Sequence, residues 1–191
     1  MPDLITERLI VRPFRMDDVD AYLHVFAEGD APGEANEPPA WFEWATRNPA
    51  ALAGLGQPPY GDRAVVSRES DQLIGAVGFV PCLMPFEMLG NFPSEAERPK
   101  TVCSTPEFGL FYSFGVAFQR QGYATEAVRA MADYAFENLN LKRIIATTEY
   151  DNDRSIRMME RLGMSIARND SGAPHYLQVV GVLRNPVLDA D

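Results

Sequence analysis

The sequence is poor in the residues on which several kinds of protein site depend. It has two cysteines, Cys82 and Cys103, and two histidines, His24 and His175, in 191 residues. Two cysteines make no disulfide framework, and no Cys/His spacing fits zinc, so we predict buried free thiols and no metal.

No apolar run approaches the roughly 20 residues of a membrane-spanning helix. The start, Met-Pro-Asp-Leu-Ile-Thr, lacks the basic and apolar parts of a signal peptide. We therefore predict a cytoplasmic protein that does not bind membranes.

Basic residues are also in short supply. The chain has 17 lysines and arginines against 27 aspartates and glutamates, which gives a net charge of −10. A protein that binds duplex nucleic acid needs a positive surface, so we predict no nucleic-acid partner. The negative field would attract cationic substrates, although solubility alone explains it equally well. The length and the apolar fraction of 46% fit one globular domain over residues 1–191.

The most informative stretch is Gln-Arg-Gln-Gly-Tyr-Ala-Thr-Glu-Ala at residues 119–127. An apolar run that favours a strand precedes it, and an amphipathic helical pattern follows it. The first turn of such a helix has N–H groups without internal acceptors, and the helix dipole attracts anions to this end. Gly122 has no side chain, so an anion can approach the main chain closely. The stretch predicts a phosphate or pyrophosphate site; the alternative is a glycine needed only for packing.

Hydrophobic periodicity and turn residues predict a mixed α/β chain in the order β-α-α-β-β-β-α-β-α-β-β, without internal repeats. Helices are expected after an N-cap at Asp17, at 41–45 before Pro49, at 122–138 and at 152–162. Strands are expected at 9–13, 63–67, 73–80, 107–118, 143–148, 164–167 and 176–183. Loops rich in glycine and proline are expected at 28–39 and 50–60.

Two spaced motifs give the chain a resemblance to a known family. Residues 119–124 read Gln-x-x-Gly-x-Ala, and residues 152–164 read as an Asn-x-x-Ser helix that ends in Leu-Gly-Met. Together they resemble the pyrophosphate loop and the second motif of the GNAT superfamily of N-acyltransferases. Thr6–Pro13 resembles the opening of its ribosomal-protein N-acetyltransferase branch. The resemblance implies an α/β GNAT fold, with a mixed, mostly antiparallel sheet that is splayed at its central strands and flanked by helices.

The resemblance also implies an acetyl-CoA-dependent N-acetyltransferase, in which a primary amine attacks the thioester directly in a ternary complex. In the family, main-chain groups of a strand hold pantetheine, those of the loop hold the pyrophosphate, and the motif asparagine reaches either. The matching positions are Tyr112, Ser113, Phe114, Gln119, Arg120, Gln121, Gly122, Tyr123, Ala124, Thr125 and Asn152. The acceptor would be a protein N-terminal α-amine or a small-molecule amine. The alternative is a catalytically silent acyl-CoA-binding sensor or interaction module.

Glu107 is the candidate general base. It lies two residues before Gly109, the position that matches the glutamate of the related branch, and this spacing keeps the same strand face. A solvated carboxylate is the alternative. Many relatives have a tyrosine, the acid for the leaving thiolate, where this chain has Met159, and resemblance to the ribosomal branch makes Ser155 the substitute. Glu126 is expected only to stabilise the first turn of its helix.

Residues 81–106 contain five prolines, a density that argues against a long helix or a central strand. The segment nevertheless keeps apolar residues such as Met84, Phe86 and Leu89. A long apolar loop is unusual unless it is functional or covered. We predict that this insertion forms part of the acceptor-site wall or a subunit contact, as in a homodimer; the alternative is a disordered insertion.

Overall fold

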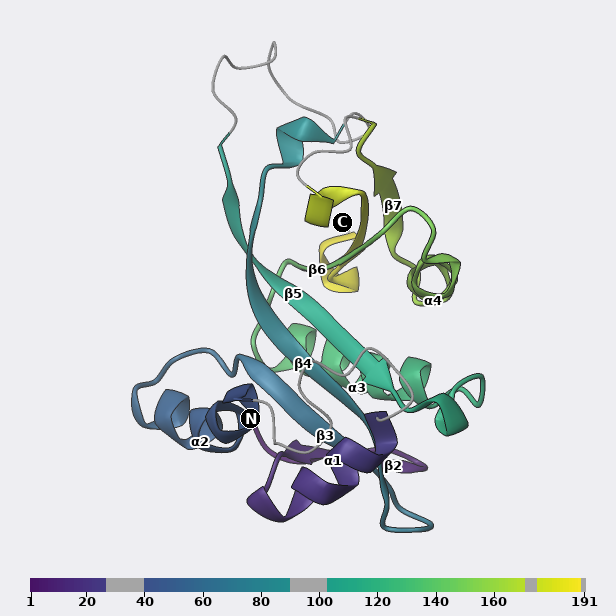
Figure 1. The fold of residues 1–191 in the computed structure, drawn as a ribbon. Coiled ribbons are helices and arrows are strands. Elements are labelled where there is room, and N and C mark those ends of the chain that lie inside the picture. The colour runs from purple at the N-terminus through teal and green to yellow at the C-terminus, as the bar shows by residue number, and fades with distance from the viewer. Residues whose placement is uncertain (27–39, 90–102, 171–174, 190–191) are drawn as a thin grey trace. The chain divides into compact units, whose positions relative to one another are not determined.

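The computed structural model of the chain describes residues 1–26, 40–89, 103–170 and 175–189 (Figure 1). The loop predicted at 28–39 and residues 90–102 of the proline-rich segment lie outside the described residues. The chain forms two compact units, Met1–Val80 with Phe111–Tyr134 (the first unit) and Pro81–Leu110 with Ala135–Asp191 (the second unit).

Eight strands form a mixed sheet in the order β1-β2-β3-β4-β5-β6-β8-β7. They are β1 (Leu4–Ile5), β2 (Leu9–Pro13), β3 (Gly61–Ser67), β4 (Leu73–Met84), β5 (Thr105–Phe114), β6 (Arg143–Thr148), β7 (Ser165–Arg168) and β8 (Val179–Arg184). Strands β5 and β6 pair in parallel at Gly109 and Ile145. The pairs β1-β2, β2-β3, β3-β4, β6-β8 and β7-β8 are antiparallel. The predicted mixed, mostly antiparallel sheet is therefore confirmed.

Helices accompany these strands in the predicted order. The described part of the chain contains α1 (Val19–Phe26), α2 (Ala40–Gly54), α3 (Tyr123–Glu137) and α4 (Asp153–Arg161). Short 3-10 turns lie at Met16–Asp18, Phe86–Met88, Val116–Phe118, His175–Leu177 and Pro186–Asp189. The predicted order of elements is confirmed, with the short strand β1 added at its start. None of the helices among the described residues has the length and apolar character needed to cross a membrane.

Aromatic residues form the core of the first unit on the side of α1 and α2. Five rings, those of Phe14, Tyr22, Phe26, Trp41 and Phe42, lie with neighbouring centroids 4.6 to 6.0 Å apart. They pack with small and branched residues of β3 and β4, and Figure 1 shows α2 beside the start of β3. Burial of such large rings stabilises this part of the fold strongly.

The second unit has a separate apolar core. Met84 and Leu89 are each 1% exposed and pack with Ile145, Leu177 and Val180 of the neighbouring elements. These two residues of the predicted insertion are therefore core residues. The prediction that the insertion as a whole forms part of an acceptor-site wall or a subunit contact stays a prediction, because residues 90–102 lie outside the described part of the chain.

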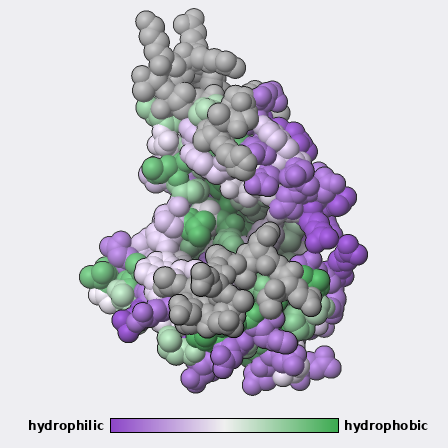
Figure 2. Space-filling model, in the orientation of Figure 1, coloured by the Kyte–Doolittle hydropathy of each residue, from purple (hydrophilic) through white to green (hydrophobic). Residues whose placement is uncertain are grey.

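Helix α4 of the second unit is amphipathic. Ile156, Met158 and Met159 are buried, and the opposite side carries exposed charged residues, which belong to a hydrophilic area in Figure 2. Gly181 of β8 lets the helix approach the sheet, since a side chain there would lie 2.8 Å from the Met159 sulfur. Gly163 follows the C-cap residue Leu162 with a φ of +83°, the left-handed conformation that commonly follows a helix.

The start of α1 differs from the prediction. Asp18 rather than Asp17 supports it, because the Asp18 carboxylate accepts the Arg15 N–H at 2.7 Å and both outer nitrogens of Arg12 at 2.7 Å. Burial by itself would raise the pKa of Asp18, but these donors outweigh it and hold the pKa below its ordinary value. A local N-cap pattern does not reveal this bidentate contact with a strand residue.

Three prolines lie inside elements that they were predicted to end. Pro49 lies within α2, so residues 50–54 of the predicted loop are helical, and Pro81 and Pro106 lie within the central strands β4 and β5. Both strand prolines are exposed, where a missing N–H leaves no buried acceptor unpaired. A proline inside a helix costs about 3 kcal/mol, and burial of Phe42 and Ala45 on the same helix offsets that cost.

Candidate functional site

The predicted anion loop lies in the first unit, between β5 and α3. Strand β5 ends at Phe114 rather than Phe118, because the chain turns into a 3-10 helix at Val116–Phe118. Arg120 and Gly122 then take positive φ angles of 63° and 83°. The Glu126 N–H donates to the Gly122 carbonyl at 3.1 Å, which starts α3 at Tyr123. The strand–turn–helix predicted around Gly122 is therefore present.

Main-chain donors of this loop are available to a ligand. In the part of the chain that the structure describes, the N–H groups of residues 120–125 donate to no acceptor. Residues 120–122 are exposed and residues 123–125 are half-buried. Donors at the first turn of a helix coincide with the positive end of its dipole. The loop therefore offers a cluster of N–H groups that suits an anion such as a diphosphate.

Two glutamine side chains support the conformation of the loop. The Gln119 side-chain amide donates to the Phe114 carbonyl at 2.9 Å, and that of Gln121 donates to the Ala117 carbonyl at 2.8 Å. Each bond ties the loop back to the end of β5 or to the turn after it. The two bonds therefore support the loop in the shape that the structure shows.

Arg8 and Glu126 join the loop to the N-terminal strands, and sequence reasoning missed this contact. Arg8 Nε donates to Glu126 Oε2 at 2.7 Å, and Arg8 Nη1 donates to the Gln121 carbonyl at 3.0 Å. Glu126 was expected only to stabilise the first turn of α3. The two residues lie 118 positions apart, so no local pattern could have paired them.

The end of β5 is fixed against β4 within the first unit. Tyr112 and Ser113 are half-buried, and Phe114 is buried. The Gly115 N–H donates to the Ile74 carbonyl at 3.1 Å. A side chain at Gly75 would collide with the Phe114 ring and the Ser113 carbonyl. The three predicted pantetheine-binding residues therefore belong to the same compact unit as the loop.

Glu107 lies in the second unit and is paired with Arg143. Arg143 Nε donates to Glu107 Oε1 at 2.9 Å, Nη2 donates to the same oxygen, and the Glu107 side chain is 8% exposed. The Arg143 guanidinium also lies 4.3 Å from the Phe86 ring centroid. The alternative of a solvated carboxylate is therefore wrong. Nearby, burial and the Glu107 charge raise the pKa of Cys82 to about 11, so this thiol is not activated.

Asn152 and Ser155 lie together at the start of α4, also in the second unit. The Asn152 Oδ1 accepts the Ser155 N–H at 3.1 Å, so Asn152 caps the helix. Met159, which occupies the tyrosine position of the relatives, is 1% exposed and belongs to the core. No proton donor stands at that position.

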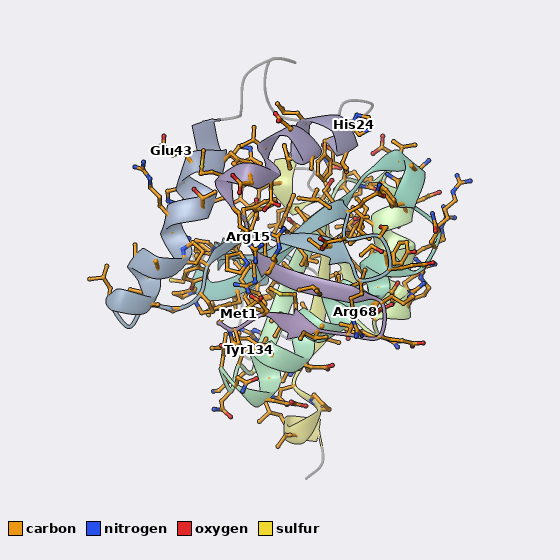
Figure 3. All side chains as sticks on the ribbon, turned by 90° about the horizontal axis from the view of Figure 1, so that it is seen from below. Met1, Arg15, His24, Glu43, Arg68 and Tyr134 are labelled. Atoms are coloured by element: carbon orange, nitrogen blue, oxygen red, sulfur yellow. The ribbon has the colours of Figure 1, made fainter. Side chains whose placement is uncertain are left out.

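The remaining polar candidates do not gather into a site. Cys82 and Cys103 are free, but Cys103 is exposed, which corrects the prediction that both thiols are buried. His24 lies exposed in the last turn of α1, as Figure 3 shows, and the side chain of His175 lies outside the described residues. Among the described residues, no three His, Cys, Asp or Glu side chains are grouped so that they could hold a metal ion.

Known proteins are similar to this chain over most of its length. The chain matches the acetyltransferase (GNAT) domain family over residues 8–165. The uncharacterized N-acetyltransferase p20 of Bacillus licheniformis is 27% identical over 164 residues, which cover 85% of this chain and 82% of the relative. An acetyltransferase from Agrobacterium tumefaciens is similar with a TM-score of 0.65 at 26% identity, covering 96% of this chain and 95% of that one.

A third similarity concerns the fold alone. RimL, a ribosomal L7/L12 alpha-N-protein acetyltransferase solved in complex with coenzyme A, has a TM-score of 0.61 at 15% identity, with 100% of both chains covered.

The family match runs from β2 to the start of β7 and so includes the loop, β5 and the Asn152 helix. Since that match spans well over half of the sequence, the chain belongs to the GNAT acetyltransferase family and is an acyltransferase.

Proposed function

We propose that the protein is an acetyl-CoA-dependent N-acetyltransferase, in which a primary amine attacks the thioester directly in a ternary complex. The cluster of unpaired N–H groups at residues 120–125 carries this proposal, because it suits the diphosphate of coenzyme A. RimL, which shares the fold, was solved with coenzyme A. Hydrogen bonds to a charged group contribute about 1.5–3 kcal/mol each. Several of them offset the unfavourable field of a chain with net charge −10.

The pantetheine arm is assigned to the end of β5. Tyr112, Ser113 and Phe114 would bind it through main-chain groups, as though it were an added strand, with Asn152 as a further contact. A backbone N–H near Phe114 would then stabilise the negative charge that develops on the thioester oxygen. Splaying of the central strands around the acyl group stays a prediction. Ser155 would protonate the leaving thiolate, in place of a tyrosine at Met159.

The acceptor is proposed to be an amine of low basicity, such as a protein N-terminal α-amine or a small-molecule amine. At pH 7 an α-amine of pKa near 7.8 needs about 1 kcal/mol for deprotonation, whereas a lysine amine near 10.4 needs about 4–5 kcal/mol. An α-amine therefore places little demand on the base. RimL is by name an α-N-protein acetyltransferase, which supports the protein class. The cytoplasmic location and the homodimer stay predictions.

Turnover on a panel of amines tests the proposal. The panel holds peptides with free N-terminal α-amines, free amino acids, polyamines and aminoglycosides, and the readout is release of free thiol from acetyl-CoA. We expect steady release with at least one amine and the acetylated amine as product by mass spectrometry. Tight binding of acetyl-CoA by calorimetry without turnover on any amine would instead support the silent sensor or interaction module.

Glu107 is proposed as the general base, and its pair with Arg143 allows a sharp test. Glu107→Gln removes the charge but can still accept a hydrogen bond from Arg143. If Glu107 is the base, kcat/KM falls by about 100-fold, while the melting temperature changes little.

Arg143→Lys is the matched control, because it keeps the charge on the partner and loses only the forked contact. We expect this variant to lose stability and to keep kcat/KM close to that of the unaltered enzyme. Equal losses of stability in both variants, with kcat/KM nearly unchanged, would show that Glu107 serves only to pair Arg143.

A further inference from the structure

The guanidinium of Arg8 connects three parts of the anion loop. Its Nε donates to Glu126 on the first turn of α3 at 2.7 Å, and its Nη1 donates to the Gln121 carbonyl at 3.0 Å. Its central carbon lies 4.6 Å from the Tyr123 ring centroid. The third nitrogen, Nη2, has no acceptor among the described residues, and it lies 3.3 Å from the point where a Cβ of Gly122 would be.

Thr6 and Glu126 hold this guanidinium in place. Glu126 Oε1 accepts the Thr6 hydroxyl at 2.6 Å and the Arg8 N–H at 2.9 Å, while Oε2 accepts Arg8 Nε. Burial alone would raise the pKa of Glu126, but the donors of Thr6 and Arg8 outweigh it and hold the pKa below its ordinary value. The carboxylate therefore stays ionised, and it fixes both the main chain and the side chain of Arg8.

We propose that Arg8 is a positioning residue of the cofactor site, one that keeps the loop in the shape that binds the diphosphate of coenzyme A. The inference rests on the proposed function. Arg8 links the Gln121 carbonyl in the loop to the Glu126 side chain on the first turn of α3, so one rigid fork joins the two sides of Gly122. Its charge also neutralises Glu126, whose negative charge would otherwise oppose a phosphate at this end of α3.

Binding measurements with three ligands test the inference in the full-length chain. The probes are coenzyme A, 3′-dephospho-coenzyme A, which keeps the diphosphate, and pantetheine, which lacks it. We expect Arg8→Met to weaken binding of the first two about 10- to 100-fold and to leave pantetheine binding unchanged. Arg8→Lys keeps the charge but not the fork, so we expect a smaller loss with the same dependence on the ligand. If Arg8→Met fails to fold, the binding measurements are made with Arg8→Lys alone.

Arg68→Met is the matched control. Arg68 also holds this turn, since its Nη1 donates to the Thr6 carbonyl at 2.7 Å and to the Glu7 carbonyl at 2.9 Å. This variant removes one positive charge that contacts the same turn. We expect it to bind all three ligands as the unaltered chain does.

Two results would overturn this inference while leaving the proposed function intact. One is equal coenzyme A affinity in the Arg8 and Arg68 variants. The other is a loss in the Arg8 variants that is as large for pantetheine as for coenzyme A, which would mark a general structural defect. If the unaltered chain bound no coenzyme A, the proposed function would fail, and this inference with it.

Discussion

Replacement of Gly122 by glutamate is expected to abolish coenzyme A binding, with an affinity loss of at least about 100-fold. Gly122 has a φ of +83°, and a Cβ there would meet only the Arg8 side chain, at 3.3 Å. A Cβ at residue 122 therefore requires Arg8 Nη2 to shift by a few tenths of an ångström, and the glutamate side chain then occupies the space in front of the loop. Its carboxylate also repels the diphosphate and competes for the same N–H groups.

Gly163→Glu is the control that separates this effect from backbone strain. Gly163 has the same φ of +83°, and a Cβ there would meet nothing within 4 Å. Both variants pay the cost of a side chain in the left-handed region, about 1–2 kcal/mol. Calorimetry should therefore show similar losses of melting temperature in the two variants, but loss of coenzyme A binding only in Gly122→Glu. Retained binding in Gly122→Glu would remove the loop from the cofactor site.

Elements set by local periodicity were predictable from the sequence. Strand β6 was predicted with its observed bounds, and the helix predicted at 152–162 differs from α4 by one residue at each end. In each case a few neighbouring residues contain the physical cause, which is an apolar run, a capping side chain or a glycine with positive φ. The loop around Gly122 belongs to the same class, because its free donors follow from the start of a helix.

Contacts between distant residues were not predictable in this way. The pairs Arg8–Glu126 and Glu107–Arg143 join residues 118 and 36 positions apart. A charged side chain in a sequence does not show its partner, so Glu126 was read as a local helix stabiliser. The prediction that the helix ends before Pro49 failed for a related reason. Buried aromatic packing on α2 outweighs the tendency of proline to end a helix.

Asp62→Asn is expected to stabilise the protein above about pH 6. Asp62 lies near the start of β3, opposite Gly78 of β4, and its Oδ1 would be 2.9 Å from a Cβ at residue 78. No residue that the structure describes donates a hydrogen bond to its carboxylate. Burial raises the pKa of Asp62 to about 6, and burial together with the Asp62 charge raises the pKa of Tyr22 to about 12. The carboxylate is thus ionised at neutral pH without a compensating partner.

The direction of the pH dependence follows from where the proton is held. In the unfolded chain an aspartate has a pKa of about 3.9. Between about pH 4 and pH 6 the unfolded state releases the Asp62 proton while the folded state keeps it. Stability therefore falls as the pH rises through this window and stays lower above it. A shift of about 2 pKa units corresponds to roughly 2–3 kcal/mol, and asparagine, which has the same shape, removes this cost.

Thermal melts of Asp62→Asn at pH 4 and pH 8 measure the effect. We expect nearly equal melting temperatures for the variant and the unaltered chain at pH 4, and a gain of roughly 5 °C for the variant at pH 8. Asp17→Asn changes the net charge by the same amount at an exposed side chain and should show no such difference between the two pH values. A gain of equal size at both pH values would show that the packing of the new amide, rather than removal of a buried charge, stabilises the variant. No gain at pH 8 would mean that the Asp62 carboxylate is solvated, and that burial does not hold its proton in the folded state.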